Sequence, residues 1–388
     1  MFFMTEAWLY IAAAVTLVHW LLPGRWRSWW IAGATAAFLG WMSPDSLVIL
    51  AALAALYYWF AGREDRISGR RLIGLISATA AVLCAYKIHA AMMGGIDLHP
   101  GMPHEDIIIP LGLSYYAFRC IHYGIEKYKG VIPKHPLAET VQYLFFLPTL
   151  ITGPIHRFPA FQKDLHRKRW DPFLFTQGLE RILYGYVKIA FLANLVVTNL
   201  FGVFIMHYAD VGSWLEAWLK LWQVGANMYF LFAGASDVAI GFGMLLGIKV
   251  MENFNWPFLS RNISDFWTRW HISLTSWCRD YVYMGTIATT RSAALAALAA
   301  MLVMGLWHEF SPRYLLWAAF QGAGIMGWQQ FQKAKLHLPA VKSEMALRAL
   351  RVFSTLLTLH YVMLGMLLVH YPTLDEALAQ IGKIVLFR

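Results

Sequence analysis

Residues 291–310 read "RSAALAALAAMLVMGLWHEF", and this stretch decides the class of fold. It is apolar and rich in small residues from Ala293 to Trp307, then ends in His308 and Glu309. A run of this kind is typical of a helix inside a membrane, and its small residues allow close packing at the centre of a helix bundle. The imidazole and the carboxylate at its end are therefore candidate functional groups.

The whole composition agrees with a membrane protein. The chain has 388 residues, of which 59% are hydrophobic and 14% are charged, and its mean hydropathy is +0.50. Water-soluble domains carry about 25% charged residues. The apolar runs show no alternation of the β-barrel kind. The sequence predicts an all-α polytopic membrane protein, folded as a single integral-membrane domain over 1–388 with no separating linker.

Charge and cysteine usage exclude several other classes. The formal net charge is +10, but the lysines and arginines lie in loops beside apolar spans, as cytoplasmic loops of membrane proteins do. We therefore expect no nucleic-acid partner. The three cysteines, Cys84, Cys120 and Cys278, lie far apart with no CxxC pair. Neither a disulfide framework nor a metal site is expected.

Apolar runs and basic loops predict the order of the spans. We expect spans near 7–22, 29–42, 46–60, 72–93, 107–124, 174–204, 292–308, 313–328 and 350–370. The run 214–248 predicts either one long broken helix or two short ones. The first span has no signal-peptide cleavage site and is expected to be retained. If the basic segments "PGRWRSWW" and "GREDRISGRR" are both cytoplasmic, the N-terminus lies outside, and so does the loop 94–106.

Two segments depart from simple spans. Residues 145–161, "FFLPTLITGPIHRFPAF", are broken by prolines and a glycine before the basic "HRKRW", which predicts a re-entrant or interfacial piece on the cytoplasmic side. Residues 252–284 are both aromatic and charged. In helical register they predict a helix that lies in the interface or packs under a bundle, with an apolar stripe of Trp267, Trp270, Leu274, Trp277 and Tyr281. His271 falls at the edge of that stripe, where periodicity favours a structural histidine.

Three polar groups stand in apolar surroundings. Ser236 and Asp237 lie in "FAGASDVAIGFG", where an ionised group usually faces a cavity or a partner. Packing of helices through small residues explains the glycines of that run equally well. His308 titrates near neutral pH and could take a proton from a hydroxyl. A histidine that merely marks the membrane boundary is an equal alternative on the sequence alone.

A family resemblance rests on two signatures, "SDFWTRWHISLTSWCRDYVYM" at 264–284 and "MGLWHEFSPRYLLWAAFQG" at 304–322. Together they resemble the membrane-bound O-acyltransferase family, and within it the bacterial branch that acts in alginate O-acetylation and in D-alanine transfer to teichoic acid. Further similar stretches extend the resemblance over about 105–330. It implies a ring of about 10–12 transmembrane and re-entrant helices around a central tunnel, in the bacterial cytoplasmic (inner) membrane.

The same resemblance implies an activity and a site. An acyl group, D-alanyl or acetyl, would pass from a cytosolic thioester to a hydroxyl of an extracytoplasmic polymer or intermediate. The donor would be the phosphopantetheine of an acyl-carrier protein, which we favour, or acyl-CoA, with no bound cofactor. A second transferase outside the membrane and membrane lipids are further expected partners. His308 and His271 are expected to be catalytic, and the residues expected to bind substrate are Glu309, Trp307, Trp270, Arg269, Asp237 and Ser236.

Glu309 departs from the family pattern, which commonly has a small residue after the "WH". Its carboxylate either reaches His308, which would orient the imidazole and raise its pKa, or points away to the acceptor or to a loop arginine such as Arg313. The orienting role requires the helix to end at or just after His308, because neighbours on a helix do not face each other. A second departure, "AGAS" before Asp237, weakens transfer of substrate detail.

Two other functions compete with this one. A transporter or flippase of an envelope precursor would explain the broken helices and Asp237, although no inverted repeat is visible. An acyltransferase for lipid or protein hydroxyls would differ only in its acceptor. Consumption of the thioester distinguishes an acyltransferase from a transporter.

Overall fold

The computed structural model describes residues 6–92, 112–167, 169–337 and 342–387. The predicted outside loop 94–106 and the start of the predicted span 107–124 lie outside these ranges. The described residues are almost entirely helical, and their only β-type pairing is a single bridge between Phe254 and Trp270. The prediction of an all-α polytopic protein is confirmed. The chain forms two compact units, Met1–Tyr186 with Ala235–Met251, and Val187–Gly234 with Glu252–Arg388.

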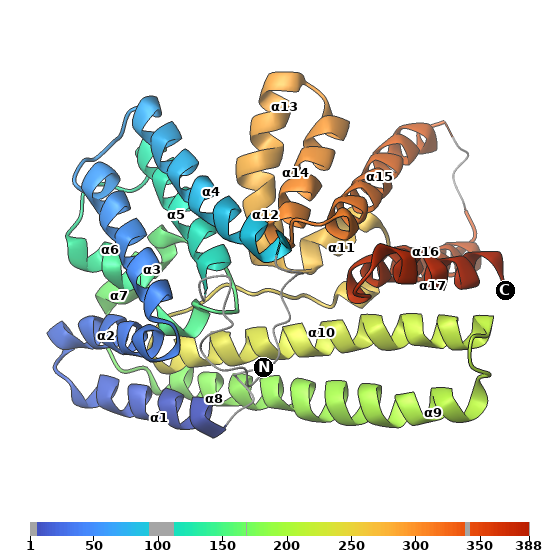
Figure 1. Ribbon diagram of the computed structural model, residues 1–388, viewed down its shortest axis with the longest axis horizontal. Coiled ribbons are helices and arrows are strands. Elements are labelled where there is room, and N and C mark those ends of the chain that lie inside the picture. Colours follow the sequence, from blue (N-terminus) through green and yellow to red (C-terminus); the bar gives the residue numbers. More distant parts are fainter. Residues whose placement is uncertain (1–5, 93–111, 168, 338–341, 388) are drawn as a thin grey trace. The chain divides into compact units, whose positions relative to one another are not determined.

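The first unit is built mainly from eight helices and the end of a ninth. They are α1 (Glu6–Leu21), α2 (Gly24–Met42), α3 (Pro44–Tyr57, continued by a π-helical turn Tyr58–Gly62), α4 (Gly69–Met92), α5 (Leu113–Lys129), α6 (Leu137–Leu144), α7 (Phe158–Arg167), α8 (Pro172–Tyr186) and the last part of α10 (Trp214–Leu245). Helices α3, α4 and α5 lie side by side (Figure 1). The predicted hairpin 29–42 and 46–60 corresponds to α2 and α3, separated by Ser43, which caps α3.

The predicted re-entrant piece is short and broken, as its prolines require. Between α6 and α7 the chain makes one 3-10 turn, Leu147–Thr149, and then runs without helix to Phe158. Arg119 of α5 is fully buried and donates to the carbonyl oxygens of Tyr143, Leu144 and Thr149. These bonds satisfy backbone groups that a broken helix leaves without partners. The guanidinium therefore holds this irregular segment in the first unit.

Glycines allow α8 and the end of α10 to approach each other closely. A Cβ built on Gly241 would lie 2.6 Å from the carbonyl oxygen of Gly178, and one built on Gly178 would lie 2.9 Å from that of Gly241. No side chain fits at either position without moving the backbone. The small-residue interpretation of the run "FAGASDVAIGFG" is thus confirmed for Gly241.

The second unit contains the remaining helices. They are a π-helical segment Val187–Leu200, α9 (Phe201–Tyr208), the first part of α10, α11 (Ile263–Arg269), α12 (Ile272–Cys278, continued by a π-helical turn Arg279–Tyr283), α13 (Met284–Thr290), α14 (Ala293–His308), α15 (Pro312–Lys335), α16 (Glu344–His370) and α17 (Leu374–Leu386). Side-chain oxygens cap the starts of several of them: Ser292 caps α14, Ser343 caps α16 and Thr373 caps α17. Such caps satisfy amide groups that have no partner within the helix.

Two sequence predictions are corrected here. The stretch 252–284 is not one interfacial helix, because α11 ends at Arg269 and α12 begins at Ile272 in a different direction (Figure 1). The predicted stripe and the placement of His271 at its edge assumed one continuous register and are wrong. Helix α17 was not predicted. By contrast, 214–248 forms the single long helix α10, one of the two alternatives that the sequence left open.

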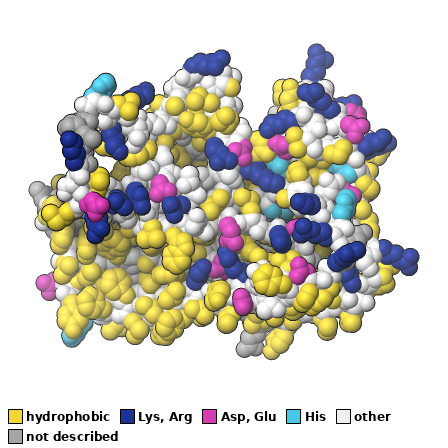
Figure 2. Space-filling view, turned by 180° about the vertical axis from the view of Figure 1, so that it is seen from behind, with side chains coloured by type: hydrophobic (Ala, Val, Ile, Leu, Met, Phe, Trp, Pro, Cys, Tyr) yellow, Lys and Arg dark blue, Asp and Glu magenta, His cyan; other side chains and the backbone are white. Residues whose placement is uncertain are grey.

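Among the described residues, five helical stretches are long and apolar enough to cross a membrane. They are Pro44–Gly62, Gly69–His89, Pro172–Tyr208, Trp214–Leu245 and Glu344–His370, and the shorter apolar helices are Ala7–Leu21 and Ala293–His308. Figure 2 shows broad hydrophobic areas on the outer surface, with lysine and arginine side chains gathered between them. An exposed apolar surface of this kind suits contact with lipid rather than with water. The number of spans, 10–12 with re-entrant pieces, stays a prediction.

Candidate active site

His271 occupies the sharp turn between α11 and α12. Its backbone is left-handed, with φ 45° and ψ 52°, a conformation that costs about 1–2 kcal/mol for a residue with a side chain. Asn253 holds the turn from across the chain: its carbonyl oxygen accepts from the amide of Ile272 at 2.9 Å, and its Oδ1 accepts from Oγ of Ser273 at 2.7 Å. The turn is therefore fixed by contacts outside its own helices.

The imidazole of His271 is buried among aromatic rings and is only 2% exposed. The ring of Phe232 lies edge-on at 4.7 Å and that of Trp307 at 6.0 Å between centroids. Burial lowers the pKa of His271 well below 6.5, and the neighbouring His308 lowers it further. Its Nε2 atom has no hydrogen-bond partner among the described residues. A neutral imidazole with an unused polar atom is suited to bind a substrate group.

His308 is the last residue of α14 and also lies beside Trp307. Its ring is 4.6 Å from that of Trp307 between centroids. On another side it stacks on Tyr314 at 5.5 Å, with 20° between the planes, and meets Trp317 edge-on at 6.0 Å. The side chain is half-buried. His308 and His271, predicted from separate signatures, are thus brought together around Trp307.

Close packing of α14 on α15 makes this arrangement possible. A Cβ built on Gly305 would lie 2.7 Å from the carbonyl oxygen of Tyr314 and 2.9 Å from the side chain of Ala318. The absence of a side chain at 305 lets the two helices touch one turn before His308. Tyr314 and Trp317 of α15 are therefore within reach of the imidazole.

Trp270 and Arg269 support the turn that carries His271. The ring of Trp270 stacks on Phe266 at 5.4 Å, and its side chain is buried. Nε of Arg269 donates to Oδ1 of Asp265 at 2.7 Å, and its backbone oxygen accepts from the amide of Asn255 at 3.0 Å. Both residues stabilise the end of α11. Their predicted contact with substrate stays a prediction.

Glu309 takes the second of its two predicted positions. Helix α14 ends at His308 and Glu309 is extended, with φ −157° and ψ 143°, so the required helix end is present. Its carboxylate, however, accepts two hydrogen bonds from Nη2 of Arg313, at 3.0 Å and 3.2 Å. Arg313 also donates to the carbonyl oxygen of Tyr371. The carboxylate and the arginine thus connect the α14–α15 turn to the end of α16.

Ser236 and Asp237 belong to the first unit and are both buried. Oδ1 of Asp237 accepts from Nε of Arg181 at 2.8 Å, which joins α10 to α8. The sequence predicted a partner or a cavity for this carboxylate, and the structure supplies a partner. Their role in binding substrate stays a prediction.

Sequence reasoning missed four residues near the histidines. Tyr314 and Trp317 were assigned only to a span, and Asn253 to an aromatic stretch. Gln321, one turn beyond Trp317, is fully buried, and neither of its amide atoms has a hydrogen-bond partner among the described residues. A buried glutamine in "WAAFQG" was the one available signal. No group of three His, Cys, Asp or Glu side chains placed to hold a metal occurs in the described ranges.

Comparison with known proteins supports the family that the two sequence signatures indicate. The model of the membrane-bound O-acyltransferase family matches residues 2–350, a range that includes the expected core 105–330. A probable alginate O-acetylase of Pseudomonas aeruginosa is 32% identical over 83% of this chain, and the match covers only 65% of that relative. The corresponding protein of Azotobacter vinelandii is 30% identical over 97% of this chain and 76% of its own. The teichoic acid D-alanyltransferase of Bacillus subtilis is 30% identical over 79% of each chain.

Proposed function

Because the chain belongs to the membrane-bound O-acyltransferase family, we propose that it moves an acyl group from a cytosolic thioester to a hydroxyl on the outer side of the membrane. The observation that carries this proposal is the pairing of His308 and His271 around Trp307. The three relatives named above are acyltransferases by name, two of them O-acetylases and the third a D-alanyltransferase.

In the proposed step, the acceptor hydroxyl attacks the carbonyl carbon of the thioester. His308 takes the hydroxyl proton as the C–O bond forms, and the C–S bond then breaks. The proton passes from the imidazole to the departing thiolate, so the products are an ester and a free thiol. The half-buried position of His308, stacked on Tyr314, favours a fixed ring orientation during this transfer.

His271 has a different role in this proposal. Its buried neutral ring would donate or accept one hydrogen bond through Nε2, to the thioester or to the amides of a pantetheine arm. The buried amide of Gln321 would bind the same arm. Polar side chains in a membrane protein are tolerated where they line a cavity, which supports a tunnel that the donor enters from the cytosol. The donor would be an acyl-carrier protein or acyl-CoA, and the acceptor a cell-envelope polymer or an intermediate carrier.

The test uses purified full-length protein in sealed lipid vesicles. Acetyl-CoA or a D-alanyl carrier protein is supplied with an alginate oligosaccharide or a teichoic acid as acceptor, and both ester formation and thiol release are measured. Equal amounts of ester and thiol are expected, and neither should form with His308→Ala. His337→Ala, a change at an exposed histidine of the same unit, is the matched control. Movement of acceptor across the vesicle without loss of thioester would instead identify a transporter.

A further inference from the structure

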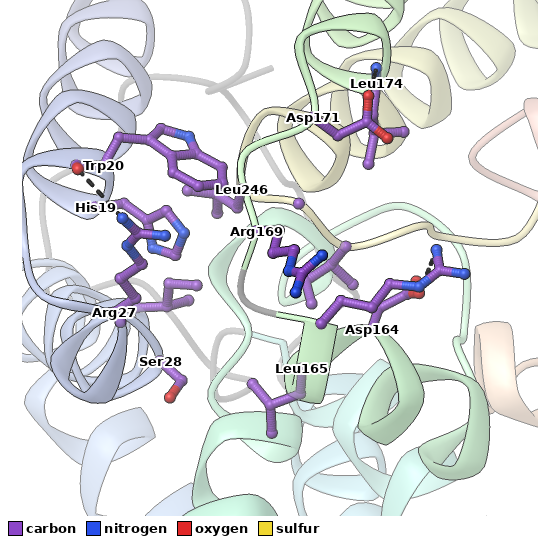
Figure 3. Close-up of a pocket in the computed structure, with 15 residues that line it drawn as sticks. His19, Trp20, Arg27, Ser28, Asp164, Leu165, Arg169, Asp171, Leu174 and Leu246 are labelled. Atoms are coloured by element: carbon purple, nitrogen blue, oxygen red, sulfur yellow. Dashed lines mark hydrogen bonds and ion pairs between the residues drawn. The ribbon is translucent and has the colours of Figure 1, made fainter.

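A basic pocket lies in the first unit, where two distant loops meet. It is lined by the end of α1, the start of α2, the segment between α7 and α8, and the residues after α10. Figure 3 shows His19 and Arg27 on one side of it, with Arg169, Asp164 and Asp171 on the other. Arg27 comes from "PGRWRSWW" and Arg169 from "HRKRW", the two basic segments that the sequence predicts on the cytoplasmic side.

The acidic side chains of this pocket are already engaged. Oδ2 of Asp164 accepts from the amide of Lys249 at 2.9 Å, and its Oδ1 lies 3.5 Å from Arg167. Oδ1 of Asp171 accepts from the amide of Leu174 at the start of α8, at 3.0 Å. These carboxylates stabilise the backbone of the two walls. They keep their negative charge, but three arginines, Arg27, Arg167 and Arg169, line the pocket against these two carboxylates, so the pocket stays net positive.

Arg27 lies in the first turn of α2, and two contacts hold its side chain in place. Its Nε donates to the carbonyl oxygen of Leu22 at 3.0 Å, and its guanidinium lies 4.6 Å from the ring centre of Trp20. Arg169 is exposed and, within the described part of the chain, has no ion-pair partner. Like charges that converge on one pocket repel each other unless an anion lies between them.

Two further groups favour an anion at this place. Helix α2 begins at Gly24 with no side-chain cap and no acidic residue in its first turn, so its amide groups and its dipole remain directed at the pocket. His19 is only 5% exposed, and its Nδ1 has no hydrogen-bond partner among the described residues. A buried polar atom without a partner is costly unless a ligand or water satisfies it. Its position in the pocket wall makes a ligand oxygen a suitable partner.

We propose that this pocket binds a phosphate group, carried either by the head group of an anionic phospholipid or by a soluble phosphate ester. Guanidinium groups, helix amides and a neutral imidazole are the donors that phosphate oxygens accept from. Exposed indoles nearby, those of Trp26, Trp29 and Trp170, are typical of the level of lipid head groups. This proposal concerns only the binding of phosphate at the pocket, so it is independent of the proposed acyl transfer.

The experiment measures binding by the full-length protein in lipid nanodiscs. Phosphatidylglycerol is offered in a phosphatidylcholine background and retained lipid is detected by native mass spectrometry. Inorganic phosphate and 4′-phosphopantetheine are titrated in separate arms by calorimetry. Retention of phosphatidylglycerol that neither soluble probe displaces identifies a lipid, whereas tight binding of a soluble probe identifies a phosphate ester.

Variants connect the binding to the pocket. Arg169→Gln and His19→Phe should each lower the affinity for phosphate by about tenfold, the loss expected for one charge-assisted hydrogen bond. Phe at 19 keeps the edge contact with the Trp20 ring, so the fold should survive. Arg63→Gln is the matched control, because Arg63 is also exposed beside a tryptophan ring and lies in the other basic segment. Equal affinity in the Arg169→Gln, His19→Phe double variant and the control, for all three probes, would overturn the proposal.

Discussion

Glu309 and Arg313, four residues apart, form an ion pair in which both carboxylate oxygens accept from the same guanidinium nitrogen, at 3.0 Å and 3.2 Å. The Glu309 carboxylate therefore points to Arg313 and does not take the alternative position, toward the imidazole of His308. The carboxylate anchors the α14–α15 turn, and Arg313 extends the anchor to Tyr371. Glu309 would therefore influence His308, the proposed base, through the position of the helix end.

The first prediction follows for Glu309→Gln. A side-chain ion pair near the surface contributes about 1 kcal/mol or less, so acyl transfer should fall by no more than about fivefold. The pH at which activity is half-maximal should not change, because the carboxylate is bound to Arg313. The pH profile of transfer measures this. An acid limb moved to lower pH would restore the orienting role.

The second prediction concerns His308. In His308→Ala the proposed base is gone, and the rate should fall by about 10²–10⁴-fold. The melting temperature should change little, because the half-buried ring contributes mainly stacking on Tyr314. His308→Gln, which keeps the shape but not the basicity, should be as inactive as His308→Ala. Activity of either variant within about threefold of wild type would remove His308 from the mechanism.

The third prediction distinguishes the effect of the His271 side chain on turnover from the effect of its left-handed backbone on stability. Asn adopts the left-handed conformation more readily than Ala does, so His271→Asn should fold normally while His271→Ala loses about 1 kcal/mol of stability. Both should lower turnover by about tenfold or more, through loss of one hydrogen bond to the donor. A variant with Asn that turns over at the wild-type rate would leave His271 a purely structural residue.

The fourth prediction is a pH dependence of stability. The pKa of His271 is held below its ordinary value of 6.5 by burial and by His308, so the unfolded chain takes up this proton before the folded chain does. Its contribution to stability is complete above pH 6.5 and is lost as the pH falls below that value. The wild type should therefore lose more thermal stability than His271→Asn between about pH 7.5 and about pH 5.5. Parallel losses in the two proteins would contradict this.

The fifth prediction concerns Asp237 and Arg181. A buried carboxylate paired at 2.8 Å should be coupled to its partner by about 0.5–3 kcal/mol in a double-mutant cycle of Asp237→Ala and Arg181→Ala. Unfolding of the four proteins in detergent gives this energy. If the two changes are additive in stability while Asp237→Ala alone weakens substrate binding, the predicted substrate role of Asp237 would be favoured over the structural one.

Most helices could be predicted from the sequence because burial in lipid requires long apolar runs. The expected spans 7–22 and 292–308 match α1 and α14 to within a residue or so. Helix α17 could not be found in this way: it is amphipathic, with Asp375 and Glu376 in its first turn and Lys383 in its last, so no apolar run marks it.

The site was predictable in its parts but not in its assembly. Periodicity gave no sign of the break at His271, because Asn253, distant in sequence, stabilises that turn. The partner of Glu309 was among the predicted alternatives, since Arg313 lies only four residues away along the chain. The partner of Asp237 was not, because Arg181 lies on another helix. Local spacing specifies neighbours on one helix, whereas contacts between helices depend on the complete fold.

Gly305 controls the surroundings of His308 from a distance, through the packing of α14 against α15. The orientation of the His308 ring depends on Tyr314 and Trp317, and their reach depends on how closely α14 lies to α15 at a residue that has no side chain. A methyl group there would widen the gap between the helices while leaving every reactive atom in the chain unchanged. Helix spacing at Gly305 can therefore change the orientation of the His308 ring without any change in the residues that contact that ring.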